Sequence, residues 1–192
     1  MSGTYPTTPV FNSVDFGSEN FNLASQTISG RMQVRNIGGQ RFKFSAAYPP
    51  LSRTEFAPVK AFIMAQRGMA ETFTIVLPEV SIKSGTATGT LSATANAAIG
   101  ATSVTVSGIS GTLKAGDMMK FANHAKVYMI AADLTGSGTL TFYPGLVSAV
   151  VNSEQIVYTN VPFTVRLGND IQEFAISTDL YYRYEVDMIE AI

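Results

Sequence analysis

The chain has 192 residues, 46% of them hydrophobic, and 13 basic side chains against 14 acidic ones. It has no cysteine, which excludes disulfides, thiolate metal sites and a cysteine nucleophile. Balanced charge without a basic run argues against a nucleic-acid partner, and no stretch approaches the roughly 18 apolar residues of a membrane span. We therefore expect a core-forming protein that binds neither nucleic acid nor membrane and carries no cleaved signal.

Charged residues are only 14% of the chain, against about 25% in typical soluble domains. This shortage hints at a surface covered by other proteins. The alternative is that Ser and Thr supply the polar surface of a β protein.

Residues 1–24 predict an amino-terminal arm. The segment is rich in Gly, Pro, Asn, Ser and Thr, yet it contains six large apolar residues at irregular spacing: Val10, Phe11, Val14, Phe16, Phe21 and Leu23. So many apolar side chains are unusual for a frayed terminus. The arm is expected to pack either on a partner or on its own core.

Residues 27–48 have the period-2 alternation of half-buried strands. Ile28, Met32 and Val34 alternate with polar residues, Asn36-Ile37-Gly38-Gly39 interrupts the pattern, and Phe42 and Phe44 resume it. The segment therefore predicts a β-hairpin whose loop contains the two glycines.

A single helix is expected from Ser52 to about Arg67. Ser52 and Glu55 form a capping box, and Phe56, Val59, Phe62 and Ile63 lie on one helical stripe. Pro58 complicates the first turns because it removes a backbone hydrogen bond.

Two later strands, residues 73–78 and 163–168, are nearly the same in design, and the composition changes between them. We interpret residues 80–160 as a small β-barrel-like module inserted between neighbouring strands of a parent domain, residues 1–79 plus 161–192. Closing such a loop costs only about 0.6 kcal/mol per doubling of its length. The fold class is thus mainly β, a β-sandwich with one short helix and an inserted module. One continuous sandwich is the alternative.

The chain ends in an alternating strand, Leu180 to Met188, that either closes the parent sheet or offers its edge to another subunit. Closing the sheet is the favoured reading.

Catalytic chemistry is not predicted. The only histidine, His124, is expected in a surface turn, and no Gly-x-Ser-x-Gly motif or acidic pair in a cleft-like context accompanies it. The glycine-bearing stretches resemble turns, and Asp117 follows Gly116 as in a tight turn where its carboxylate bonds local backbone. We expect no enzyme activity, cofactor or metal.

Two segments carry a family resemblance. Residues 30–78, with Gly-Gly-Gln, Tyr-Pro-Pro-Leu and Glu-Phe-Ala-Pro, resemble tail-tip proteins of tailed bacteriophages, in particular distal tail or baseplate-hub ring proteins. Residues 111–146, from Leu-Lys-Ala-Gly-Asp to Tyr-Pro-Gly-Leu, are similar to the β-module such proteins can carry. The family implies a six-membered ring that joins the tail tube to the hub or fibres. It also implies a virion protein, made in the host cytoplasm, with itself, the tube protein and hub proteins as partners.

A ring needs two different patches on each subunit. The candidate interface residues are Phe11, Phe16, Phe21, Arg31, Arg35, Tyr181 and Arg183. A carbohydrate-binding or adaptor module at the tail periphery is the alternative, with Tyr128 and Tyr143 as exposed aromatics that would touch a glycan.

Overall fold

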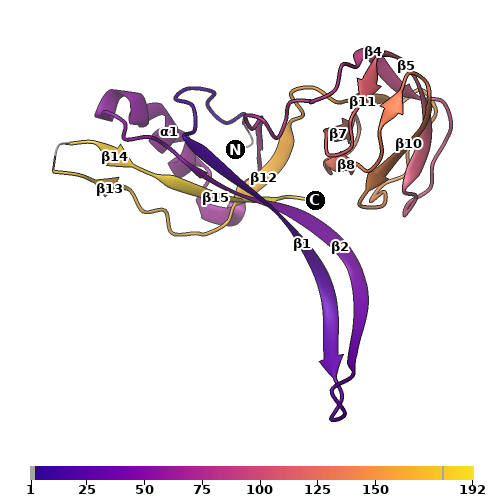
Figure 1. The fold of residues 1–192 in the computed structure, drawn as a ribbon. Helices are drawn as coiled ribbons and strands as arrows, with labels where there is room; N and C mark the ends of the chain where they lie inside the picture. The colour runs from indigo at the N-terminus through magenta and orange to yellow at the C-terminus, as the bar shows by residue number, and fades with distance from the viewer. Residues whose placement is uncertain (1–2, 179) are drawn as a thin grey trace.

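The computed structural model describes residues 3–178 and 180–192 and is mainly β. The elements, in chain order, are β1 (Ser13–Gln26), β2 (Met32–Ala47), α1 (Arg53–Ala65), the 3₁₀ turn η1 (Gly68–Ala70), β3 (Phe73–Ile75), β4 (Thr88–Ala93), β5 (Ser103–Ser110), β6 (Thr112–Leu113), β7 (Met118–Phe121), β8 (Tyr128–Ile130), β9 (Leu134–Thr135), β10 (Gly138–Tyr143), β11 (Gln155–Val157), β12 (Phe163–Leu167), β13 (Ala175–Ile176), β14 (Tyr182–Arg183) and β15 (Glu185–Glu190). Figure 1 shows three parts: a sheet with its helix, a barrel, and a long hairpin that projects from both. The expected fold class, mainly β with one α-helix, is confirmed.

A five-stranded sheet in the order β1-β2-β15-β12-β3 gathers both ends of the chain. The two strands of similar design, β3 and β12, are antiparallel neighbours, as predicted. The terminal strand β15 lies between β2 and β12, so it closes the sheet and is not an edge. Short β13 and β14 form a separate hairpin at the end of the sheet away from the barrel (Figure 1).

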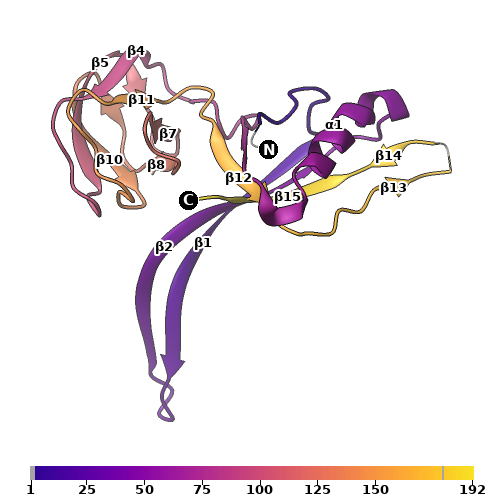
Figure 2. The same ribbon diagram turned by 180° about the vertical axis from the view of Figure 1, so that it is seen from behind.

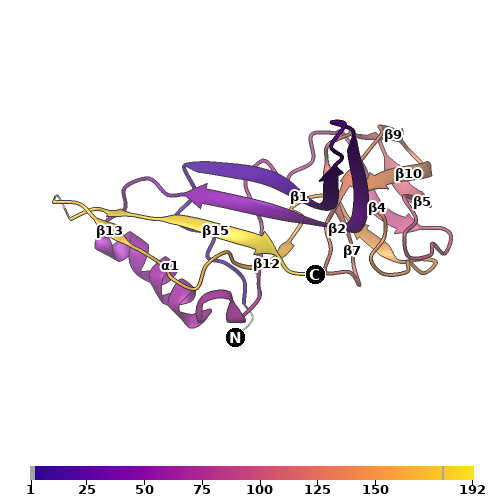
Figure 3. The same ribbon diagram turned by 90° about the horizontal axis from the view of Figure 1, so that it is seen from below.

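Helix α1 lies along one face of this sheet (Figures 2 and 3). Its buried side chains are Phe56, Val59 and Ile63, the expected apolar stripe. At its start the Glu55 carboxylate accepts hydrogen bonds from the Ser52 backbone N–H (2.9 Å) and hydroxyl (2.7 Å), which satisfies a donor at the helix amino terminus. The helix continues through Pro58, whose exposed position leaves the unpaired carbonyl of the preceding turn open to water.

The predicted hairpin within residues 27–48 is wrong, because its turn and its partner strand lie elsewhere. Residues 32–47 form one continuous strand, β2, which pairs antiparallel with β1, so the turn lies between Gln26 and Met32. The two glycines form a bulge inside β2, where the pairing shifts between Asn20 and Asn22. Gly38 and Gly39 have φ of 86° and 85°, a conformation that side chains with a Cβ rarely adopt. Much of the segment read as an irregular arm is therefore strand β1.

The amino-terminal residues before β1 pack on their own sheet. Thr4 bridges Thr74 of the edge strand β3, and Tyr5 is buried in the sheet's core. This segment covers the β3 edge, which would otherwise present unpaired backbone groups.

The chain between β3 and β12 forms a closed barrel of strands β10-β5-β4-β11-β7-β8 with its own hydrophobic core. The Val161 N–H donates to the Ser81 carbonyl at 3.0 Å, so the chain enters and leaves this region at adjacent points. Glycines allow β4 and β5 to approach closely, since a Cβ at Gly108 would lie 2.2 Å from the Thr90 carbonyl oxygen.

Within the described ranges, no helix is both long and apolar enough to cross a bilayer. In the same ranges no group of three or more His, Cys, Asp or Glu side chains gathers as it would around a metal ion.

Candidate functional site: the projecting hairpin and its root

The outer part of the β1–β2 ribbon, residues 20–40, is here called the projecting hairpin. It extends away from both the sheet and the barrel (Figure 1). Strand β15 pairs with β2 only from Lys43 to Ala47, and β1 pairs with β2 alone. Within the described residues both long edges of the projecting hairpin therefore present unpaired backbone groups, the arrangement that invites strand addition.

Both faces of the projecting hairpin carry exposed apolar side chains. Cross-strand pairing sets Ala24 opposite Val34, and Leu23 opposite Arg35 on the other face. The large exposed hydrophobic residues here are Phe21, Leu23, Ile28, Met32, Val34 and Ile37. The expectation that Met32 and Val34 lie on a half-buried strand is wrong: both side chains are exposed, and none of the residues that the structure describes forms a second layer over this part of the ribbon. A two-stranded ribbon in water is marginally stable by itself.

The charges on the projecting hairpin are all positive. Arg31 and Arg35 are its only charged residues, and both side chains are exposed. Nearer the sheet, Arg41 lies over the ring of Phe21 at 5.8 Å and Lys43 pairs with Glu19 at 2.9 Å.

A buried polar cluster, defined as Gln40, Lys126 and Glu190, lies at the root of the projecting hairpin. The Lys126 ammonium donates to the Gln40 side-chain carbonyl at 2.6 Å and pairs with the Glu190 carboxylate. All three side chains are nearly inaccessible, with exposed fractions of 3%, 2% and 1% in the order Gln40, Lys126, Glu190. One residue comes from the hairpin root, one from the barrel and one from the terminal strand.

Glu190 also binds two backbone amides from different parts of the molecule. Its carboxylate accepts from the N–H of Val127 in the barrel at 2.9 Å and from the N–H of Phe42 in β2 at 3.1 Å. The Phe42 amide lies just past the last β2–β15 pair, so the carboxylate occupies the point where the two strands diverge. Burial lowers the pKa of Lys126, while the Glu190 carboxylate raises it and offsets part of that effect.

Further contacts join the barrel to the rest of the chain. The Tyr143 hydroxyl donates to the Asn20 side-chain carbonyl at the start of the projecting hairpin. Lys120 of β7 donates to the Thr164 hydroxyl of β12 at 3.3 Å. A groove of about 630 Å³ separates the hairpin root from the barrel segment Tyr143 to Val147.

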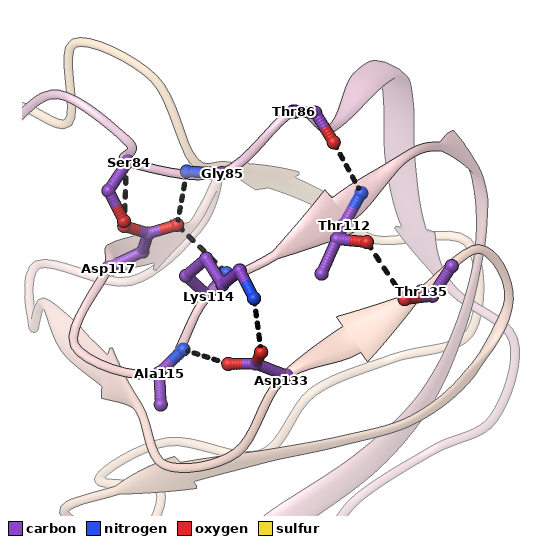
Figure 4. A network of polar contacts seen from close by, with 9 residues as sticks. All are labelled: Ser84, Gly85, Thr86, Thr112, Lys114, Ala115, Asp117, Asp133 and Thr135. Atoms are coloured by element: carbon purple, nitrogen blue, oxygen red, sulfur yellow. Dashed lines mark hydrogen bonds and ion pairs between the residues drawn. The ribbon is translucent and has the colours of Figure 1, made fainter.

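A second polar network fixes the chain where it enters the barrel (Figure 4). The Asp117 carboxylate accepts from the Ser84 N–H and hydroxyl, both at 2.7 Å, and from the Lys114 N–H at 3.0 Å. Burial raises the pKa of Asp117, but these hydrogen bonds together outweigh it and leave the pKa below its ordinary value. The prediction that this carboxylate bonds local backbone is confirmed, and it holds the entering linker as well.

The structure distributes the predicted interface residues over three regions. Phe16 lies at the hairpin root against Phe42 and Phe44, and Phe21, Arg31 and Arg35 belong to the projecting hairpin itself. Phe11 is half-buried and stacks on Tyr5 and Tyr48 of its own domain. Tyr181 and Arg183 are exposed on the separate β13–β14 hairpin.

Two sequence expectations about the barrel are wrong. His124 does lie in the turn between β7 and β8, but it is buried beside Phe121, with Nδ1 3.2 Å from the Tyr128 hydroxyl. Tyr128 is itself fully buried, so of the two aromatics proposed to touch a glycan only Tyr143 is exposed. The His124 and Tyr128 side chains face inward because they fill the barrel core.

The buried polar cluster was not predicted. Lys126 lies in the segment between β7 and β8 and Glu190 ends β15, so no local pattern signals their burial, and Lys126 and Glu190 are 64 residues apart in the sequence. Only the alternation at the chain end, which places Glu190 on the same face as buried Met188 and Val186, indicated an inward carboxylate.

Comparisons with known proteins agree with this architecture. Residues 79–161 match the family model of the B domain of distal tail protein pb9. Over 169 residues the chain is 24% identical to distal tail protein pb9 of Escherichia phage T5, covering 83% of this chain and 80% of that protein. The sequence resemblance to phage tail-tip proteins is thereby confirmed: this chain is similar to a distal tail protein of a tailed bacteriophage.

Proposed function

We propose that this phage tail protein assembles through its projecting hairpin into a closed ring, a hexamer as the family resemblance implies. The ring would join the tail tube to the hub, baseplate or fibres. The observation that carries the proposal is a long two-stranded ribbon with two free edges and apolar side chains exposed on both faces. Such a ribbon is stabilised when other strands cover its edges.

The two free edges suit a ring because they differ. The β1 edge of one subunit can pair with the β2 edge of the next subunit. The same contact then repeats around an axis. Contacts of this head-to-tail kind form rings when the rotation closes. In this proposal the parent domain, residues 1–79 plus 161–192, builds the ring, and the module of residues 80–160 lies beside it.

The proposal requires no catalytic group. Its partners are other copies of the chain, the tail tube protein and hub proteins, and its place is the virion. The interface is expected to include Phe21, Arg31 and Arg35. The β13–β14 hairpin, which carries Tyr181 and Arg183, would contact a different partner or neighbour because it lies at the far end of the sheet.

The test compares two Val→Asp variants of similar exposure. Val34 on the projecting hairpin is 61% exposed and Val151 on the barrel is 56% exposed. Purified wild-type protein is expected to give rings or concentration-dependent oligomers in light scattering and negative-stain microscopy. Val34→Asp should shift it to monomers, whereas Val151→Asp should leave the oligomers intact.

Both variants should keep the circular dichroism spectrum of the folded wild type, because neither side chain is in a core. A wild type that stays strictly monomeric at high concentration and with tube or hub proteins would contradict the proposal. Equal oligomerisation of the two variants would contradict the role of the hairpin.

A further inference from the structure

The barrel contacts both strands of the projecting hairpin at its root. Lys126 binds Gln40 on β2, and Tyr143 binds Asn20 on β1. These contacts reach both strands of the ribbon at one cross-strand pair, Asn20 and Gln40, just beyond the point where the ribbon leaves the sheet. The barrel therefore sets where the hairpin points, although residues 20–40 extend beyond it.

The buried polar cluster makes that grip directional. An ammonium and a carboxylate out of water are tolerated only in a geometry that supplies good pairing and hydrogen bonds. Lys126 finds Glu190 and Gln40 here, and it also lies 4.5 Å from the centre of the Phe42 ring. A tilt of the barrel or the hairpin would break these bonds and leave a buried charge without its partner.

Gln40 passes the restraint on to the ribbon. Its carbonyl accepts from Lys126, and its side-chain amide donates to the Ser18 hydroxyl of β1 at 2.8 Å. The carbonyl of this side-chain amide therefore binds the barrel, and its NH₂ group binds the other strand of the ribbon. The position also lies next to the Gly38–Gly39 bulge, where both glycines have positive φ.

We propose that the barrel is a strut that fixes the direction of the projecting hairpin through Lys126, Gln40 and Glu190, so that hairpins of neighbouring subunits meet at one angle. The second clause rests on the proposed ring. The first concerns a single subunit and can be tested without it.

The test measures distances inside one subunit by pulsed electron paramagnetic resonance. Because the chain has no cysteine, a pair of introduced cysteines provides the only two sites that a thiol-reactive spin label can modify. Exposed positions in the three parts are Asn22 at the hairpin, Ser137 on the barrel and Ala61 on α1. The wild type should give narrow distance distributions for the hairpin–barrel, hairpin–helix and barrel–helix pairs.

Gln40→Met keeps the volume of the side chain and the Lys126–Glu190 pair but removes the link to the ribbon. Both hairpin distributions should broaden at least twofold while the barrel–helix distribution stays narrow. Lys126→Met should broaden all three. The control is Lys114→Met, which removes an exposed ion pair with Asp133 on the same barrel and should leave all three narrow.

Narrow hairpin distributions in folded Gln40→Met protein would overturn the strut. If neither variant folds, hydrogen exchange of the wild-type protein decides, because the Phe42 and Val127 amides bind the Glu190 side chain and should exchange slowly. Rapid exchange at both amides would also overturn it. Failure of the ring itself would appear separately, as monomeric wild type with narrow distance distributions.

Discussion

Replacement of Asp117 by Asn tests how the barrel holds its entering linker. The carboxylate is 4% exposed and accepts from three groups on Ser84 and Lys114, with the Gly85 N–H a longer fourth donor at 3.4 Å. An amide keeps one acceptor oxygen and places an NH₂ group against the remaining N–H donors (Figure 4). The substitution is isosteric, so its effect reports polar contacts and not packing.

The magnitude follows from the bonds that are lost. Hydrogen bonds to charged groups are worth about 1.5–3 kcal/mol each, and an unsatisfied buried donor adds a similar penalty. If the Asn oxygen stays on Ser84, the lost bond is the one from Lys114, with the weak Gly85 contact beside it. Asp117→Asn should therefore lower the free energy of unfolding of the barrel by about 2–4 kcal/mol.

The pH dependence has a definite sign. Because the folded-state pKa of Asp117 lies below its ordinary value, its contribution is present above the unfolded pKa of about 3.9 and is lost as pH falls through the folded pKa. The wild-type barrel should lose stability over this acid range. Asp117→Asn should be less stable at pH 7 and flatter below pH 4.

The effect is measured by urea unfolding, with circular dichroism and hydrogen exchange as the probes. Tryptophan fluorescence cannot serve as a probe because the chain has no tryptophan. The matched control is Asp133→Asn in the same network. Asp133 is about half exposed, and an Asn there keeps an oxygen for the Ala115 N–H, so the change should be much smaller than that of Asp117→Asn. An Asp117→Asn barrel within about 0.5 kcal/mol of wild type would refute the reasoning.

Two further variants test the barrel's backbone and its independence. Gly108→Ala should destabilise the barrel by more than about 3 kcal/mol in thermal or urea unfolding, because the new Cβ would lie 2.2 Å from a facing carbonyl oxygen of β4. Gly116→Ala is the control: its φ of 95° is close to the 100° of Gly108, but nothing lies within 4 Å of its Cβ, so only about 1 kcal/mol of backbone strain is expected. A chain that joins Glu79 to Val161 through a short linker should keep the sheet protected in hydrogen exchange, and Glu190→Gln should stabilise it further by removing a carboxylate left without its lysine. Loss of all protection in the joined chain would show that sheet and barrel fold as one unit.

Local patterns in the sequence were sufficient for several features because those features depend on near neighbours. The capping box, the buried stripe of α1 and the turn at Asp117 each involve residues within a few positions of one another. The pairing of β3 with β12 was also predictable, because two strands of matched design flank a change in composition. The resemblance to phage tail proteins rested on the same short motifs.

Other features were read wrongly because the local signal had two solutions. Two glycines between alternating runs fit a hairpin turn and a bulge equally well, and only the length of β1 opposite them selects the bulge. The alternation of Met32 and Val34 fits a strand with one covered face, but the sequence of a single subunit does not say what covers it. In the same way a histidine in a turn was expected at the surface, and the barrel closed over it.

The sequence by itself determined the β class, the helix, the paired flanking strands and the resemblance to phage tail proteins, because these follow from periodicity, caps and short motifs. Tertiary structure alone decided that residues 20–40 project from the body and that Gln40, Lys126 and Glu190 meet at their root. The physical reason is that burial of a charge depends on partners distant in the chain. Lys126 and Glu190 have no local pattern in common, and they become a pair only when the barrel, the terminal strand and the hairpin root close around the same point.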